Sequence, residues 1–147
     1  MDVEDHSVDD FTANAEANRA VIELVNDGLA AFNESVCPDP AAAPVTLSIR
    51  NEDRVIAGLL GSNAHGWMRV DMVWVDERHR GRGVGTALLE KAEQVARARG
   101  CHGIHLDTQS YQAPGFYEKL GYVPFARLES YPGDHQRIYL RKDIGRG

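Results

Sequence analysis

The clearest pattern of apolar and polar positions lies between residues 67 and 99. In its first part, apolar and polar side chains alternate with a period of two, which is typical of a strand with one buried face. In its second part, apolar residues recur at helical spacing and the pattern ends at a glycine, which favours an amphipathic helix. The pattern therefore predicts a strand, a turn and a helix, with the apolar face of the strand formed by Met68, Val70, Met72 and Trp74.

The turn between this strand and this helix is rich in glycine and arginine. It runs Arg80-Gly81-Arg82-Gly83-Val84-Gly85. Glycines let the backbone approach a ligand closely, and the first amides of a helix have no partner within the helix. Such a turn can cradle a phosphate at the positive end of the helix dipole. The glycine spacing fits neither a dinucleotide-binding fingerprint nor a P-loop.

Shorter patterns along the rest of the chain predict a mixed α+β domain. Helical spacing favours one helix over 14–33 and a short one over 112–120, with Pro114 in its first turn. Because a helix joins the strand at 67–75 to the strand at 101–107, these two strands should be parallel. The remaining strands are expected at 45–50, 54–60, 122–129 and 136–142. We expect one domain over 13–147 and a disordered acidic tail over 1–12.

Composition narrows the class of protein and its partners. The chain has 147 residues and a net charge of −6, and five of its acidic residues lie among the first ten. Nucleic-acid binding usually needs a basic face, which this sequence does not predict. No apolar run approaches the ~20 residues of a membrane span, and no signal peptide is evident, so we expect a cytoplasmic protein. Cys37 and Cys101 fit no metal spacing, and we expect no metal site.

Two motifs together resemble those of a known superfamily. The first is Arg/Gln-x-x-Gly-x-Gly/Ala, formed here by Arg80, Gly83 and Gly85, and the second is Ala-x-x-Phe-Tyr-x-x-x-Gly-Phe/Tyr over 113–122. In this order and spacing they resemble the GNAT superfamily of acetyl-CoA-dependent N-acetyltransferases. The resemblance implies a mixed, twisted sheet with helices on both faces. It also implies that the central strand and the strand near His105 splay apart into a V that holds acetyl-CoA.

The resemblance also implies which residues bind acetyl-CoA. The backbone of Val73 would bind the acetyl carbonyl, and the backbone of Val75 would bind the pantetheine arm, with a β-bulge nearby to direct these groups. Trp74 lies between these two residues and is included in the predicted site. The pyrophosphate would lie on Arg80, Gly81, Arg82, Gly83, Val84, Gly85 and Thr86. Ser110 stands where many relatives have asparagine, and its hydroxyl can still donate one hydrogen bond to the cofactor.

Two side chains are candidates for catalysis. Tyr117 would lie beside the CoA sulfur and protonate it, or it merely packs with Phe116 under the short helix. Asp71 would act as a base through water, anchor a cationic substrate, or form a salt bridge with Arg50, Arg54 or Arg69. His105 is an alternative base if it faces the cleft.

The motifs and candidate residues together predict an acetyl-transfer reaction, and two other functions remain open. We expect transfer of acetyl from acetyl-CoA to a primary amine of a small molecule by direct attack in a ternary complex. The alternatives are acetylation of protein lysines or N-termini, and a non-catalytic sensor of acyl-CoA. The resemblance makes a homodimer possible.

Overall fold

The computed structural model describes residues 13 and 15–145, and the chain divides into two compact units, 1–38 and 39–147. Within the first unit, α1 (Arg19–Val36) begins where the side chain of Asn18 accepts a hydrogen bond from the amide of Val21 at 3.2 Å. No residue of α1 is buried. Compared with the predicted helix over 14–33, α1 starts five residues later and ends three residues later. The predicted tail over 1–12 lies outside the described residues.

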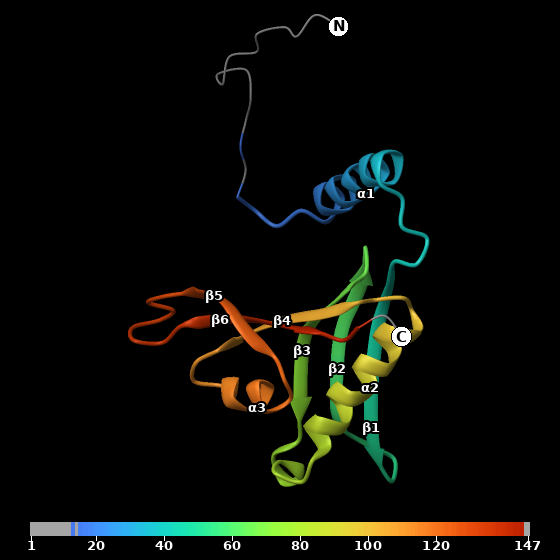
Figure 1. The fold of residues 1–147 in the computed structure, drawn as a ribbon. Helices are drawn as coiled ribbons and strands as arrows, with labels where there is room; N and C mark the ends of the chain where they lie inside the picture. Colours follow the sequence, from blue (N-terminus) through green and yellow to red (C-terminus); the bar gives the residue numbers. More distant parts are fainter. Residues whose placement is uncertain (1–12, 14, 146–147) are drawn as a thin grey trace, which may run out of the picture. The chain divides into compact units, whose positions relative to one another are not determined.

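The second unit is built on one six-stranded sheet (Figure 1). Its order is β1-β2-β3-β4-β6-β5, and every neighbouring pair is antiparallel except β3 and β4, which are parallel as predicted. This arrangement confirms an open, mixed α+β fold. The strands are β1 (Ala43–Asn51), β2 (Arg54–Ala64), β3 (Trp67–Val75), β4 (Gly103–Gln109), β5 (Val123–Leu128) and β6 (Arg137–Asp143).

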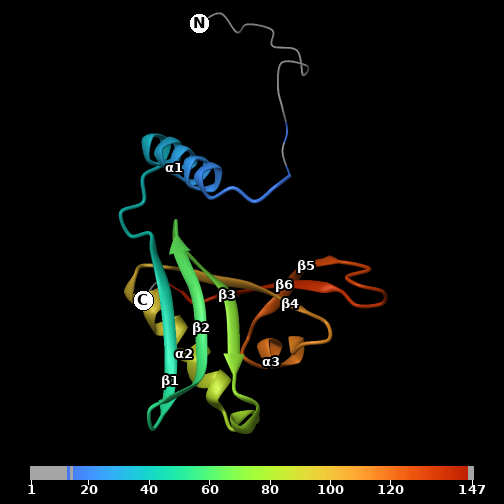
Figure 2. The same cartoon turned by 180° about the vertical axis from the view of Figure 1, so that it is seen from behind.

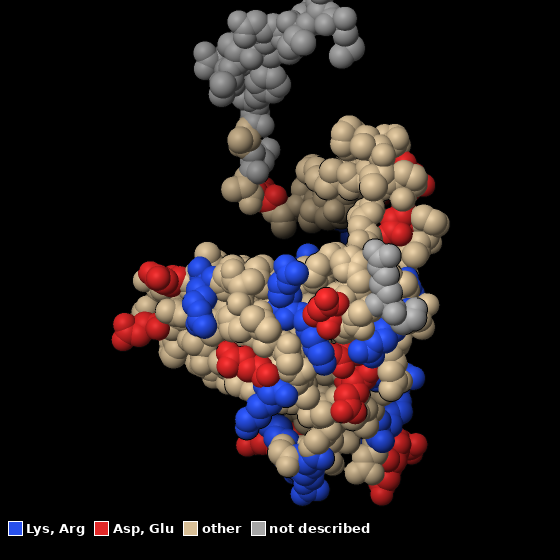
Figure 3. All heavy atoms as spheres, viewed as in Figure 1, with Lys and Arg blue, Asp and Glu red and all other residues tan. Residues whose placement is uncertain are grey.

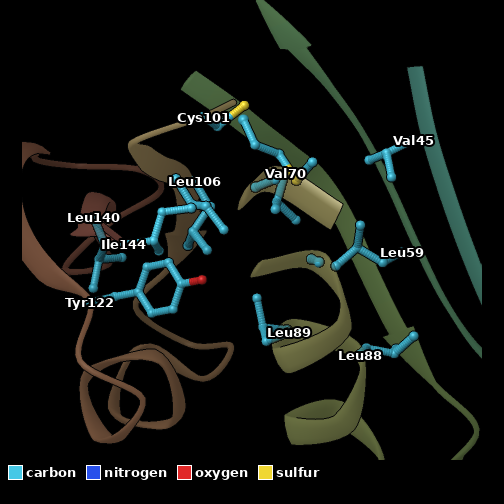
Figure 4. Close-up of a cluster of buried hydrophobic side chains, with 14 of the residues drawn as sticks. Val45, Leu59, Val70, Leu88, Leu89, Cys101, Leu106, Tyr122, Leu140 and Ile144 are labelled. Carbon is cyan, nitrogen blue, oxygen red and sulfur yellow. The ribbon is translucent and has the colours of Figure 1, made fainter. Parts of the chain in front are cut away.

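Helix α2 (Val84–Ala98) connects β3 to β4 and covers one face of the sheet (Figures 1 and 2). Its apolar side, including Leu88 and Leu89, meets strand side chains such as Leu59, Val70 and Leu106 in one buried cluster (Figure 4). A short 3-10 helix, η2 (Glu77–His79), precedes the turn, and α3 (Pro114–Lys119) follows β4. The core thus fixes β3, β4 and the start of α2 relative to one another.

The two parallel strands stay together for only four residue pairs. Trp67 to Val70 pair with Gly103 to Leu106, and no pairing continues beyond Val70 and Leu106. From that point β3 continues beside β2, while β4 continues beside β6. The strands therefore separate into the predicted V, and the gap lies within the sheet itself.

A β-bulge in β3 lies at the point where the strands separate. Leu60 of β2 pairs with Met72 and Gly61 pairs with Val70, so Asp71 is an extra residue with no partner across the ladder. A side chain at Gly61 would not fit, because a Cβ there would lie 2.2 Å from the carbonyl oxygen of Arg69. The predicted bulge is present, two residues before Val73.

This bulge corrects one sequence-based prediction. Strict alternation placed Met72 and Trp74 on the buried face together with Met68 and Val70. The extra residue reverses the alternation, so Met72 and Trp74 are 66% and 50% exposed. Val73 and Val75 pack against the core in their place.

Candidate active site

A cleft of about 740 Å³ opens between the separated strands. One wall is β3 from Val70 to Val75, the other is the end of β4 with the loop to Ala113, and Tyr117 of α3 also lines the cleft. A second hollow of about 520 Å³ lies beside the start of α2. The two share five lining residues, Val73, Val75, Arg80, Ala113 and Tyr117. They form one continuous site with a strand-lined half and a glycine-lined half.

The glycine-lined half is shaped to accept a phosphate. Gly81 and Gly83 have φ angles of 73° and 79°, a left-handed conformation that favours glycine, and a Cβ at either would meet no atom within 4 Å. The amides of Val84, Gly85 and Thr86 open α2 and have no carbonyl partner within the helix. The helix dipole adds positive potential at this point. The turn thus leaves open space in front of backbone donors.

Arg80 fixes the outer edge of the glycine turn. Its Nε donates to the carbonyl of Val75 at 3.0 Å, which ties the turn to the end of β3. Nearby, His79 Nδ1 lies 3.1 Å from Asp76 Oδ2, and this hydrogen bond is the main cause that lowers the pKa of Asp76. Arg80 and His79 both line the hollow, whereas Arg82 does not.

Tyr117 lies where the two halves meet. Its ring is edge-on to Phe116, with centroids 5.1 Å apart, and Phe116 in turn lies against Gly85 of α2. Burial raises the pKa of the Tyr117 phenol, and the negative charge of Asp107 raises it further. The phenol therefore remains protonated at neutral pH and can donate a proton into the site. The side chain packs against Phe116 and also lines the cleft, and its placement beside the CoA sulfur stays a prediction.

Asp71 lines the strand-lined half of the site. Its Oδ1 accepts from Arg69 Nε at 2.7 Å, so one of the three salt bridges considered from the sequence is formed. Arg54 pairs instead with Asp76, at 3.6 Å. The Asp71 side chain is 39% exposed, so this ion pair remains accessible to solvent.

Asp107 is a second carboxylate in the cleft, and it is not among the site residues predicted from the sequence. It lies on β4 directly after the last residue paired with β3. Its Oδ2 forms an ion pair with Arg137 of β6, whose guanidinium also donates to the Tyr131 hydroxyl at 3.0 Å. Along β4, polar residues alternate with apolar ones, so the sequence pattern does not single out Asp107. Its partner, Arg137, is thirty positions away and shares no motif with it.

Comparison with known protein families identifies the family of this chain. The profile of the GNAT acetyltransferase family matches residues 8–122. The chain belongs to the GNAT acetyltransferase family. The curated Acetyltransferase Atu2258 of Agrobacterium fabrum is 37% identical over 132 residues, which cover 88% of this chain and 93% of that protein. The crystal structure of an acetyltransferase from Agrobacterium tumefaciens matches with a TM-score of 0.84 at 31% identity, over 90% of this chain and 98% of that one.

Two further relatives differ in the substrates that their names state. The blasticidin-S acetyltransferase of Streptomyces morookaense is 37% identical over 106 residues, 71% of this chain and 78% of that protein. A peptidyl-lysine N-acetyltransferase of Salmonella typhimurium is 31% identical over 121 residues, 82% of this chain and 70% of that protein. The protein is accordingly an acetyl-transferring enzyme, and similarity alone leaves its acceptor open.

Acetyl-CoA is the acetyl donor of GNAT acetyltransferases, and the glycine-lined half of this site fits its pyrophosphate. The open space at Gly81 and Gly83 and the amides of Val84, Gly85 and Thr86 suit a doubly charged anion. Bound acetyl-CoA supplies a thioester whose carbonyl carbon an amine can attack. The individual contacts predicted for the backbone of Val73 and Val75 remain predictions, although both residues line both halves of the site.

Besides Arg82, two further predicted residues do not line the site. The Ser110 hydroxyl accepts from the amide of Gln136 at 2.9 Å and joins the end of β4 to the segment before β6; it lines neither hollow. His105 does not line the cleft either, so it does not suit the alternative role of base. It lies instead in a separate hollow with Trp67, Phe125 and Arg141. Burial and then Arg69 lower the pKa of His105.

The surface is mixed in charge. Lys and Arg side chains are interspersed with Asp and Glu on the face shown in Figure 3, without a continuous basic area there. Among the described residues, no helix is long and apolar enough to cross a membrane. No group of acidic, histidine and cysteine side chains in the described part of the chain could hold a metal ion.

Proposed function

We propose that this enzyme transfers acetyl from acetyl-CoA to a primary amine of a small molecule, by direct attack in a ternary complex. The observation that carries the proposal is the continuous site between β3 and β4. Its glycine-lined half suits the donor, and its strand-lined half leaves a cleft of a size typical for a small ligand. The similarity to an enzyme named for blasticidin S supports an acceptor of this size.

The residues of the cleft have complementary roles in this reaction. The backbone amide of Val73 would donate to the acetyl carbonyl oxygen and stabilise the negative charge that develops there. The amine nitrogen forms its bond to the carbonyl carbon, the carbon–sulfur bond breaks, and the sulfur takes a proton. Tyr117 would supply that proton, because its partly buried phenol is neutral and lines both halves of the site.

Asp71 would take part in the steps before bond formation. An ammonium must lose a proton before it can attack, and a carboxylate can accept this proton through water or hold the cation in place. A covalent acetyl-cysteine route through Cys101 is disfavoured, because this cysteine is buried in the core and does not line the cleft.

The test is release of free thiol from acetyl-CoA with a panel of small primary amines and a panel of lysine-containing peptides. The proposal expects turnover with small amines, and kcat/KM values well above those for peptides. A preference for peptide lysines would instead favour protein acetylation, which the similarity to a peptidyl-lysine acetyltransferase makes a specific second candidate. Tight binding of acetyl-CoA without transfer to any acceptor would identify a sensor.

A further inference from the structure

The point where the sheet opens brings two carboxylates to opposite walls of the cleft. Val70 and Leu106 form the last pair between β3 and β4, and the next residue on each strand is an aspartate. Asp71 is also the bulge residue of β3. The two strands therefore diverge with one acid at the start of each free wall, and both acids line the cleft with Tyr117.

Each carboxylate is held by an arginine from outside the cleft. Asp71 Oδ1 binds Arg69 and Asp107 Oδ2 binds Arg137, yet neither arginine lines the cleft. The described residues offer no hydrogen bond to the second oxygen of either carboxylate. Arg80 is the one lysine or arginine among the described lining residues, and its Nε donates to the Val75 carbonyl beside the glycine-lined half.

The arginine that holds Asp107 is itself fixed more firmly than the arginine that holds Asp71. Arg137 is fixed by Asp107 and by the Tyr131 hydroxyl, and its guanidinium carbon lies 5.5 Å and 5.9 Å from the ring centroids of Tyr131 and Tyr139. The Asp107 side chain is 32% exposed, so it is partly shielded from water. A carboxylate in a fixed position and partly dehydrated attracts a cation more strongly than a mobile one on the surface.

We propose that Asp107 is a specificity-determining residue of the acceptor half, and that with Asp71 it selects acceptors carrying two positive charges. The inference rests on the proposed function and narrows its substrate class to diamines and other dicationic amines. One carboxylate meets the reacting ammonium and the other meets the second cation. A monocation places a positive charge beside only one of the two carboxylates, and an acceptor with its own carboxylate is repelled.

The test compares three acceptors with the same carbon chain, namely pentanediamine, pentylamine and aminopentanoate, by thiol release from acetyl-CoA. We expect kcat/KM for the diamine to exceed that for the monoamine by about tenfold or more, with the amino acid lowest. Asp107→Asn should reduce this preference to about twofold, mainly through a higher KM for the diamine, and leave the Kd of acetyl-CoA unchanged. Asp107→Glu should retain part of the preference.

Asp53→Asn is the matched control, since it removes the same charge in the exposed turn between β1 and β2. It should leave the ratio between acceptors unchanged. Equal kcat/KM values for all three acceptors in the unaltered enzyme would overturn the inference and leave the proposed function standing, and this comparison needs no variant to fold. An unchanged ratio in Asp107→Asn would also overturn it. Transfer to peptides alone, or to no acceptor, would overturn the proposed function and the inference with it.

Discussion

Replacing Gly61 with alanine tests how the sheet is opened. The bulge at Asp71 places the backbone of β3 against β2 so that the carbonyl of Arg69 lies over Gly61. The added Cβ would lie 2.2 Å from that oxygen. The obstacle is backbone rather than a flexible side chain, so one strand must move by roughly 1 Å to restore a normal contact.

The energetic cost follows from this overlap. Forcing an extra carbon into a closely packed place typically costs 1–3 kcal/mol, and the upper end, about 3 kcal/mol, applies because the strands are hydrogen-bonded on both sides. Val73 lies two residues beyond the bulge and would move with it. Since a displacement of ~1 Å at a reacting group can cost about 10²-fold in rate, we expect kcat/KM to fall by that order.

The assay combines urea unfolding with steady-state kinetics. Both tryptophans of the chain, Trp67 and Trp74, lie on β3, so fluorescence reports directly on this strand. Gly58→Ala is the matched control in the same strand, because its Cβ would meet only the Leu47 carbonyl oxygen at an ordinary 3.4 Å. It should be neutral or stabilising by about 0.5 kcal/mol. If Gly61→Ala equals this control in both stability and kcat/KM, the structural role assigned to the bulge is wrong.

Two further predictions concern partly buried side chains, Tyr117 and Lys142. Tyr117→Phe should lower kcat about 10²-fold with little change in the Kd of acetyl-CoA, as measured by calorimetry and thiol release. Because burial raises the pKa of the Tyr117 phenol above its ordinary value, the phenol should lose its proton only at a higher pH than a free tyrosine does. A loss of kcat at a lower pH than this, if absent from the phenylalanine variant, would contradict the assignment. Lys142→Met should destabilise the fold by about 2 kcal/mol, because it removes the partner that lies 2.5 Å from buried Glu93. Lys91→Met on the exposed side of α2 is its control. Equal urea midpoints for the two variants would show that the ion pair between Lys142 and Glu93 does not stabilise the fold.

Much of the fold follows from local patterns. The glycine turn, α2 and the parallel pairing of β3 with β4 were predicted from apolar spacing and from the handedness of the crossover. The orientation of Met72 and Trp74 was wrong because a single bulge residue reverses the alternation of a strand. The structural sign of this bulge is Gly61, which belongs to another strand, so the sequence of β3 alone does not reveal it.

The site was predicted unevenly for a similar reason. The glycine turn and Tyr117 lie in compact motifs, so their place beside the cleft could be expected from the sequence. Asp107 depends on Arg137 of a distant strand, and its position in the cleft arises only when the sheet divides. The start of α1 depends on a single capping side chain, Asn18, although the three alanines at 13, 15 and 17 favour a helix further upstream.

The most direct test of the site is acetyl-CoA affinity in a pair of variants that differ in one charge. Gly83 has a left-handed conformation, which asparagine and aspartate tolerate better than other residues, and it lies at the start of α2. Gly83→Asn and Gly83→Asp therefore add nearly the same bulk, while the aspartate adds a negative charge that favours the helix itself. Calorimetry should show that the Asp variant binds acetyl-CoA at least tenfold more weakly than the Asn variant, although it is no less stable. Equal affinities in the two folded variants would mean that the pyrophosphate lies elsewhere, and would contradict the assignment of the glycine turn as the acetyl-CoA site.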